Sequence, residues 1–255
     1  MILFYTASQD ATIYLQQPYQ NTGIDEMLEI SKVYYGDTQD ISRILIQFDT
    51  TEISKSIANS TIPSGSFTAS LQLKITKADE IAARFNVEAY PISQSWENGT
   101  GTRFDNITTN GATWYYKNGD NTSSIWNNTY VAGQGASFNA FTTGSQTGLG
   151  GTWFTSSVSS QSFQYTIEDI NLDVTAFVRK WNSGSITNNG IILKFPTDKE
   201  NDSVDYGSIK MFSTETNTIY QPKLVITYLE TDVVSGSLTN IADFINSSSF
   251  TYTLN

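Results

Sequence analysis

Alternation of apolar and polar residues is the feature of this sequence that most narrows its fold. In residues 70–76 the apolar side chains of Leu71, Leu73 and Ile75 fall on one face of an extended chain. The same period of two recurs in residues 43–48, 84–89 and 162–167, whereas residues 190–195 and 223–228 are more continuously apolar. Turn-forming Gly and Asn residues separate these segments. The sequence therefore predicts an all-β protein, built as an antiparallel β-sandwich.

One segment has helical spacing instead. Four apolar residues occur at positions i, i+3, i+4 and i+7, namely Val174, Phe177, Val178 and Trp181. Asp173 is placed to cap the start of such a helix, and Gly184 is placed to end it. Burying each apolar side chain would contribute about 1.5–3 kcal/mol. We therefore expect one short helix near residues 174–182 that covers one end of the sandwich.

The domain organisation follows from the distribution of these patterns. Residues 1–228 are expected to form one β-sandwich domain, and residues 229–255 a C-terminal extension. Within the domain, residues from about 97 to 160 read as an aromatic-rich loop insertion of Gly, Asn, Ser and Thr. Four of the five tryptophans lie at or within its limits: Trp96, Trp114, Trp126 and Trp153. A loop of this length is uncommon, so we expect it to contain short strands and to bind a partner.

Charge and composition exclude several classes of function. The formal net charge is −11, which repels nucleic acids, and there is neither Cys nor His. Thiolate chemistry, imidazole bases and zinc-thiolate sites are thereby removed. A pair of carboxylates could still hydrolyse glycosides, and the candidates are Glu97, Asp105, Glu168, Asp169 and Asp173. No spacing joins two of them in one site, so we interpret them as loop charges, caps and turn formers, and we expect no enzyme activity.

Two further expectations concern metal and membrane. Ca²⁺ could bind oxygen-rich loops as a structural ion. The candidate ligands are Asp10, Asp37, Asp40 and Asp49 near the first sheet, and Asp198, Asp202 and Asp205 in an acidic hairpin loop after Phe195. No apolar stretch approaches the roughly 18 residues of a membrane span. The N-terminal segment is apolar for only a few residues and has no basic region, so it does not read as a signal peptide; we expect synthesis in a cytoplasm, the alternative being that a leader was removed.

The aromatic residues of the insertion are the candidate contact site. Aromatic rings stack on the apolar faces of sugars, while amide side chains bind the hydroxyls. The residues proposed to contact a glycan or a protein partner are Trp114, Tyr115, Tyr116, Trp126 and Tyr130. The alternative is that alternate residues, such as Trp114 and Tyr116, turn inward and cover one end of the core.

Several short motifs occur in a characteristic order along the chain. They include Arg-Ile-Leu-Ile-Gln-Phe-Asp at 43–49, Trp-Glu-Asn-Gly at 96–99, and Thr-Trp at 113–114. The second half adds residues 171–181, Asn-Gly-Ile-Ile-Leu-Lys at 189–194, Phe-Ser-Thr-Glu at 212–215, and Gln-Pro-Lys-Leu-Val-Ile-Thr-Tyr at 221–228. This order resembles the DNRLRE domain family over most of residues 1–228.

The resemblance implies a jelly-roll-like β-sandwich similar to carbohydrate-binding modules. Such domains occur on bacterial surface proteins, beside polysaccharide-degrading enzymes and in phage virion proteins. The aromatic insertion and the C-terminal extension favour a structural or adhesive component of a phage virion, in its head, neck or tail. Its partners would be other virion subunits, in a homo-oligomer or a hetero-assembly, and a surface polysaccharide. The alternative is a carbohydrate-binding module of a polysaccharide-associated protein.

The C-terminal extension has apolar residues with no evident place in a finished sandwich. These are Leu238, Ile241, Phe244 and Ile245 at helical spacing, and Phe250, Tyr252 and Leu254 in strand alternation. Such a segment could add a strand to a partner's sheet and fill a groove beside it. We expect it to be an assembly arm that docks on a neighbouring subunit, the alternative being that it folds back on its own core.

Overall fold

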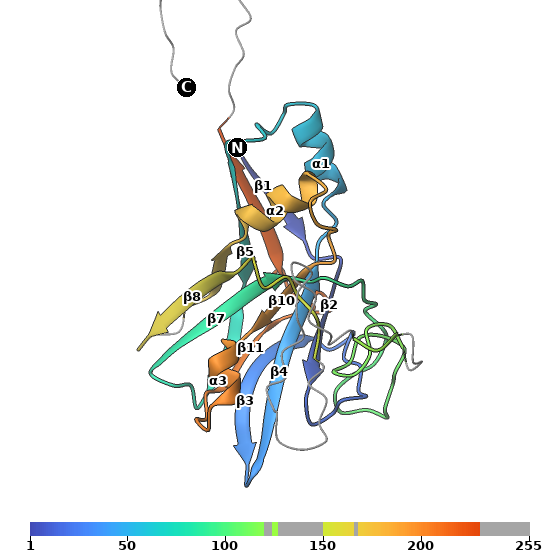
Figure 1. Ribbon diagram of the computed structural model, residues 1–255, viewed down its shortest axis with the longest axis vertical. Helices are drawn as coiled ribbons and strands as arrows, with labels where there is room; N and C mark the ends of the chain where they lie inside the picture. The colour runs from blue at the N-terminus through green and yellow to red at the C-terminus, as the bar shows by residue number, and fades with distance from the viewer. Residues whose placement is uncertain (120–123, 127–149, 166–167, 230–255) are drawn as a thin grey trace, which may run out of the picture.

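The computed structural model of the protein describes residues 1–119, 124–126, 150–165 and 168–229 (Figure 1). Within these ranges the chain forms twelve β-strands and three short α-helices. Every strand pairing is antiparallel. The predicted all-β sandwich is therefore confirmed.

The strands form two sheets. The smaller sheet has the order β1 (Ile2–Thr6), β12 (Lys223–Tyr228), β5 (Phe67–Leu73) and β9 (Ile170–Asp173). The larger sheet has the order β6 (Ile75–Asp79), β11 (Gly207–Phe212), β3 (Met27–Tyr35), β4 (Thr38–Gln47), β10 (Ile191–Lys194), β7 (Arg84–Pro91) and β8 (Ser159–Gln164). A further strand, β2 (Gln9–Tyr14), also pairs with β4. The first and last strands of the described sandwich thus lie side by side in the smaller sheet.

The main core fills the space between the two sheets. It receives alternate residues of the strands, such as Leu71 from β5, Leu172 from β9, Ile226 from β12 and Ile44 from β4. All four side chains are at most 1% exposed. The period of two in the sequence therefore corresponds to one buried face of each strand.

The predicted helix is confirmed as α2 (Thr175–Asn182). Phe177, Val178 and Trp181 of α2 belong to the main core together with Val174, which is the N-cap residue of the helix, and Trp181 is 8% exposed. The Asp173 carboxylate accepts a hydrogen bond from the Thr175 N–H at 2.9 Å, and Gly184 lies just beyond the helix with φ of 71°. Figure 1 shows α2 beside α1 (Thr51–Ala58) at the end of the sandwich that carries the N-terminus.

Two further helices were not predicted. α1 (Thr51–Ala58) buries Ile53 and Ile57 in the main core. α3 (Thr197–Asn201) replaces the acidic hairpin loop expected after Phe195. The buried side chain of Glu200 in this helix accepts hydrogen bonds from Arg43 on β4, and these contacts anchor the segment against the larger sheet.

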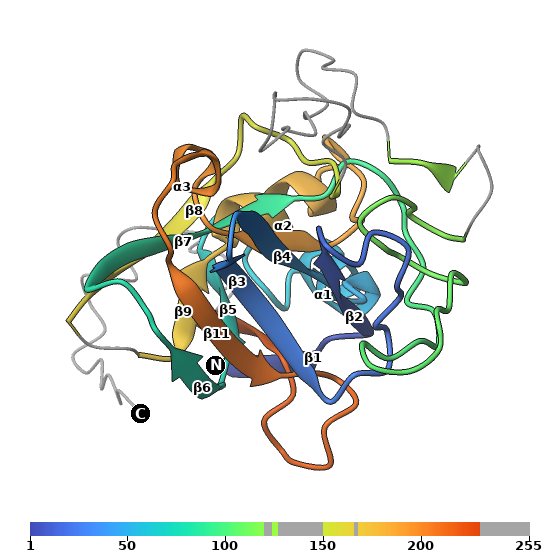
Figure 2. The same cartoon turned by 90° about the horizontal axis from the view of Figure 1, so that it is seen from below.

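A second core lies on the opposite face of the larger sheet. Ile41 and Leu45 of β4, Ile192 of β10 and Ile13 of β2 contribute to it. It is covered by four tryptophans at or within the limits of the insertion, Trp96, Trp114, Trp126 and Trp153. Figures 1 and 2 agree that the described part of the insertion lies beside β2 and β4. The central strands β4 and β10 of the larger sheet are therefore buried on both faces.

Candidate functional site

Two of the five aromatic residues proposed for ligand contact, Trp114 and Trp126, belong to the second core. Trp114 is 3% exposed and Trp126 is 1% exposed, and the indole N–H of Trp126 donates to the Thr113 carbonyl oxygen at 2.9 Å. Their ring faces are therefore covered by the protein's own side chains. Short strands were expected in the insertion. Among its described residues before β8, the structure has isolated β-bridges in their place, Ile92–Trp153 and Tyr116–Ile125.

A charged cluster lies beneath these tryptophans. The Arg43 guanidinium lies 4.6 Å from the ring centroid of Trp114 and 5.3 Å from that of Trp153. It makes a two-pronged contact with Glu200, at 3.1 Å from Nε to Oε1 and 2.9 Å from Nη2 to Oε2. Lys194 lies 3.0 Å from the same carboxylate, and all three charged side chains are 0% exposed. The cluster joins α3, the larger sheet and the insertion, so its role is structural.

Two of the proposed contact residues do reach the surface. Tyr115 and Tyr116 are half-buried, and with Tyr19 they form what we call the tyrosine cluster. The Tyr115 and Tyr116 ring centroids are 5.0 Å apart, and Tyr19 lies 5.4 Å and 6.0 Å from them. Tyr19 is 46% exposed and was missed by sequence reasoning, because it lies almost a hundred residues earlier in the chain.

The open edge of the smaller sheet is a second candidate surface, which we call the β1 edge. Strand β1 pairs with β12 on one side, and no strand pairs with its other side within the described residues. Met1 and Ile2 are each 55% exposed, and Phe4 is 63% exposed. The amino terminus donates to the Tyr228 carbonyl oxygen at 2.7 Å, so the described chain ends beside the first residues of β1, on the side that pairs with β12.

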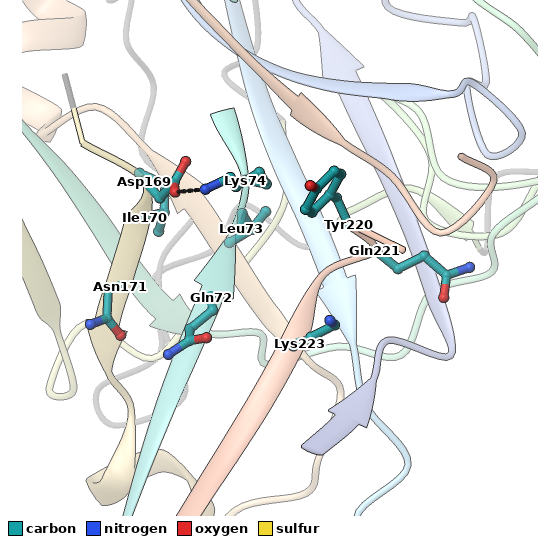
Figure 3. Close-up of a pocket in the computed structure, with 9 residues that line it drawn as sticks. All are labelled: Gln72, Leu73, Lys74, Asp169, Ile170, Asn171, Tyr220, Gln221 and Lys223. Atoms are coloured by element: carbon teal, nitrogen blue, oxygen red, sulfur yellow. Dashed lines mark hydrogen bonds and ion pairs between the residues drawn. The ribbon is translucent and has the colours of Figure 1, made fainter. Parts of the chain in front are cut away.

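A third candidate is a polar pocket of about 320 Å³ at one end of the smaller sheet (Figure 3). Nine residues line this sheet pocket: Gln72, Leu73, Lys74, Asp169, Ile170, Asn171, Tyr220, Gln221 and Lys223. They come from β5, β9, β12 and the segments that flank these strands. The pocket is open and combines one aromatic ring with amide, ammonium and carboxylate groups, which suits a small polar ligand.

The carboxylates considered for catalysis do not converge. Asp169 pairs with Lys74, Asp105 accepts from the Thr102 hydroxyl, and Asp173 accepts from the Thr175 N–H. Glu97 and Glu168 are exposed. The salt bridge with Lys74 and a hydrogen bond from the Ile75 N–H lower the pKa of Asp169, although its partial burial opposes this. These contacts fit the interpretation as loop charges and turn formers.

The calcium candidates are likewise dispersed. Among the described residues, no three acidic side chains come together in a geometry that could hold a metal ion. Asp202 binds the Lys32 ammonium, Asp205 accepts from the Gly207 N–H, and Asp40 accepts from the Gln16 N–H. Asp10 is 1% exposed and accepts from the Thr214 N–H, and its burial raises its pKa to about 7.

The remaining predicted contact residues lie outside the described residues. These are Tyr130 of the insertion and, in the C-terminal extension, Leu238, Ile241, Phe244, Ile245, Phe250, Tyr252 and Leu254. None of the described helices has the length and apolar character to cross a bilayer.

Comparisons with known proteins add no relative. The sequence matches no model of a known protein family, and no curated protein matches it. The resemblance to the DNRLRE domain family therefore stays a prediction.

Proposed function

We propose that this protein is a non-catalytic structural or adhesive component of a phage virion that acts by binding other subunits. The observation that supports this proposal best is the β1 edge. There the backbone groups of β1 on one side lack a strand partner within the described residues, and Ile2 and Phe4 project beside them. Such an edge is a ready template for strand addition.

The β1 edge needs a cover because exposed apolar edge strands promote aggregation. Native proteins usually protect an edge with charged residues, proline or a bulge. Residues 2–6 of β1 are Ile-Leu-Phe-Tyr-Thr and contain none of these, and their pairing with β12 is regular in register. A partner strand on this edge would bury Phe4 and satisfy the open backbone groups.

The occupant proposed for the β1 edge is residues 230–255 of a second copy. This segment follows Leu229, which is 80% exposed and lies beside the N-terminus. Fully extended, it could reach on the order of 80–90 Å, enough to cross a neighbouring subunit. The alternation of Phe250, Tyr252 and Leu254 fits a strand with one apolar face. The copies would thereby assemble through exchanged arms.

Sedimentation velocity tests the assembly proposal directly. The full chain is expected to form oligomers, whereas residues 1–229 and the Phe4→Lys variant are expected to remain monomeric. Tyr35→Lys is the matched control, because Tyr35 is 67% exposed and lies at the end of β3 in the larger sheet. A full chain that sediments as a monomer would refute the proposal. Mass spectrometry of purified particles should also find the protein among virion subunits.

A second candidate function is carbohydrate binding, and the tyrosine cluster favours it. Tyr19, Tyr115 and Tyr116 present partly exposed rings on one patch of the insertion side. Rings of this kind can stack on sugars. Glycan-array binding that is lost in Tyr115→Ala and Tyr116→Ala, in a chain that stays monomeric, would favour this function over assembly.

A further inference from the structure

The floor of the sheet pocket is a row of hydrogen-bonding side chains. Lys223 of β12 lies opposite Gln72 of β5, which in turn lies opposite Asn171 of β9. Directly opposed residues of antiparallel strands project on the same face, and neighbouring strands are about 4.8 Å apart. Since Leu71, Leu172 and their alternates fill the core, this row faces outward. Three polar groups are thus presented at a regular spacing across three strands.

These polar groups are available to a ligand. Within the described residues, the side chains of Gln72, Asn171 and Lys223 make no hydrogen bond or ion pair to the protein. Gln221 differs, because its side-chain amide donates to the Thr214 carbonyl oxygen at 2.7 Å and points away from the row (Figure 3). The row therefore offers two amides and one ammonium to a ligand.

The wall of the pocket holds an aromatic ring in a fixed place. Tyr220 stacks on Phe212 at 5.5 Å between ring centroids and 22° between ring planes, and it remains 44% exposed. Figure 3 shows the ring above Lys223 and near Lys74. The ion pair between Lys74 and Asp169 closes the other side. An apolar ring face beside a row of polar groups matches the two-sided character of a sugar ring.

The charge of the pocket favours an anion. Its charged residues are Lys74, Asp169 and Lys223, and the first two neutralise each other. Within the part of the chain that the structure describes, Lys223 thus leaves one positive charge without an ion-pair partner, in a protein whose formal net charge is −11. A ligand with one anionic group would pair with the Lys223 ammonium in the same row that binds its hydroxyls.

We propose that the sheet pocket binds a saccharide that carries an anionic group. The Tyr220 ring packs on the apolar face of one sugar unit, Gln72 and Asn171 bind hydroxyls, and Lys223 binds the carboxylate or phosphate. This site is distinct from the tyrosine cluster, which lies on the insertion. The inference rests on the adhesive part of the proposed function and names its ligand class and its contact residues.

Isothermal titration calorimetry of the full chain with three probes tests the inference. Trigalacturonate carries carboxylates, glucose 6-phosphate carries a phosphate, and maltotriose is neutral. At least one anionic probe is expected to bind more tightly than maltotriose, and which of the two binds identifies the anionic group. Lys223→Gln should weaken that probe about tenfold, to the level of the neutral sugar, because it removes a charge-assisted hydrogen bond. Tyr220→Ala should weaken the anionic probe and maltotriose alike.

Two matched controls distinguish the loss of a contact in the pocket from the general effect of removing a positive charge or an exposed ring. Lys77→Gln removes a positive charge from β6 in the larger sheet, where Lys77 pairs with Asp79, and should leave affinity unchanged. Tyr35→Ala removes an exposed ring at the end of β3 and should also leave it unchanged.

Each unfavourable result would contradict a different claim. Absence of binding by any probe, or binding that Lys223→Gln and Tyr220→Ala leave intact, overturns the sheet pocket as a saccharide site. Equal binding of maltotriose and the anionic probes overturns its preference for an anion. Loss of probe binding in Tyr115→Ala alone would move the glycan contact to the tyrosine cluster and keep the adhesive function. Oligomerisation of the full chain, measured in parallel, reports on the assembly function independently of all three results.

Discussion

Replacing Glu200 with Gln tests whether the buried charge cluster holds the insertion, α3 and the larger sheet together. Glu200 is the carboxylate that both Arg43 and Lys194 contact, and all three side chains are 0% exposed. Removing one partner of a buried ion pair typically costs about 3–5 kcal/mol, because the remaining charge stays buried and unpaired. Here two cations lose their shared partner. We expect Glu200→Gln to lower the free energy of unfolding by about 3–5 kcal/mol near pH 7.

The loss should become smaller as the pH rises. Burial already lowers the pKa of Lys194, while Glu200 opposes this effect. Without the Glu200 carboxylate, the pKa of Lys194 falls further, and the ammonium releases its proton more easily in the folded state. Because the unfolded state then binds more protons than the folded state, stability rises with pH toward the ordinary pKa of lysine. Glu88, which lies opposite Lys194 across β7 and β10, limits the loss by supplying a second carboxylate.

Urea unfolding, followed by tryptophan fluorescence at pH 7 and pH 9.5, measures both effects. Fluorescence is a suitable signal because Trp114 and Trp153 flank the Arg43 guanidinium. Glu52→Gln is the control, since it removes a carboxylate from an exposed pair with Lys55 and should leave the unfolding midpoint unchanged. A loss below about 1 kcal/mol for Glu200→Gln, within the range of exposed pairs, would refute the assignment of a buried, mutually dependent cluster.

Three other predictions follow from the same structure. Trp181→Ala should cost about 3–5 kcal/mol in urea unfolding because Trp181 is buried in the main core, whereas Phe104→Ala, at 86% exposure, should cost less than about 0.5 kcal/mol. Burial raises the pKa of Asp10 to about 7, which favours the protonated carboxyl in the folded state. Protonated Asp10 therefore stabilises the folded protein fully below about pH 4, and this stabilisation is lost as the pH rises through about 7. Between the unfolded and folded pKa values of Asp10, the free energy of unfolding should fall by about 1.4 kcal/mol per pH unit, and Asp10→Asn should flatten this decline. An unaltered pH profile of stability in Asp10→Asn would show that Asp10 is not the source of the decline. The protein should release no reducing sugar from polysaccharides, and cleavage that Glu97→Gln abolishes would contradict this.

The elements that could be predicted from the sequence are those with one clear periodicity. The helix α2 was predicted to within a residue because its N-cap residue Val174 and three residues within the helix repeat on one face, and all four enter the main core. Helix α1 offers only Ile53 and Ile57 at such a spacing, which is too little to distinguish it from a loop. Helix α3 depends on Glu200 reaching Arg43, a contact between residues far apart in the chain.

The candidate site was harder to predict because aromatic residues suit both a core and a binding surface. Trp114 and Trp126 are buried only because a second apolar face exists beneath them. The sequence does indicate this second apolar face. Strands covered on both faces are apolar at consecutive positions, as are Ile44 to Ile46 and Ile191 to Leu193. The sheet pocket has no local signal, since Gln72, Asn171 and Lys223 become neighbours only through the strand register.

Disulfide trapping tests the proposed arm exchange most directly, because the chain has no native cysteine. One preparation carries Phe4→Cys at the β1 edge, and another carries Tyr252→Cys in the C-terminal extension. Mixed under mild oxidation, they should form a disulfide-linked heterodimer, whereas Tyr35→Cys in place of Phe4→Cys should not. If the extension instead covers its own β1 edge, only a chain with both substitutions would form the bond, within a single copy. That result would contradict assembly through exchanged arms.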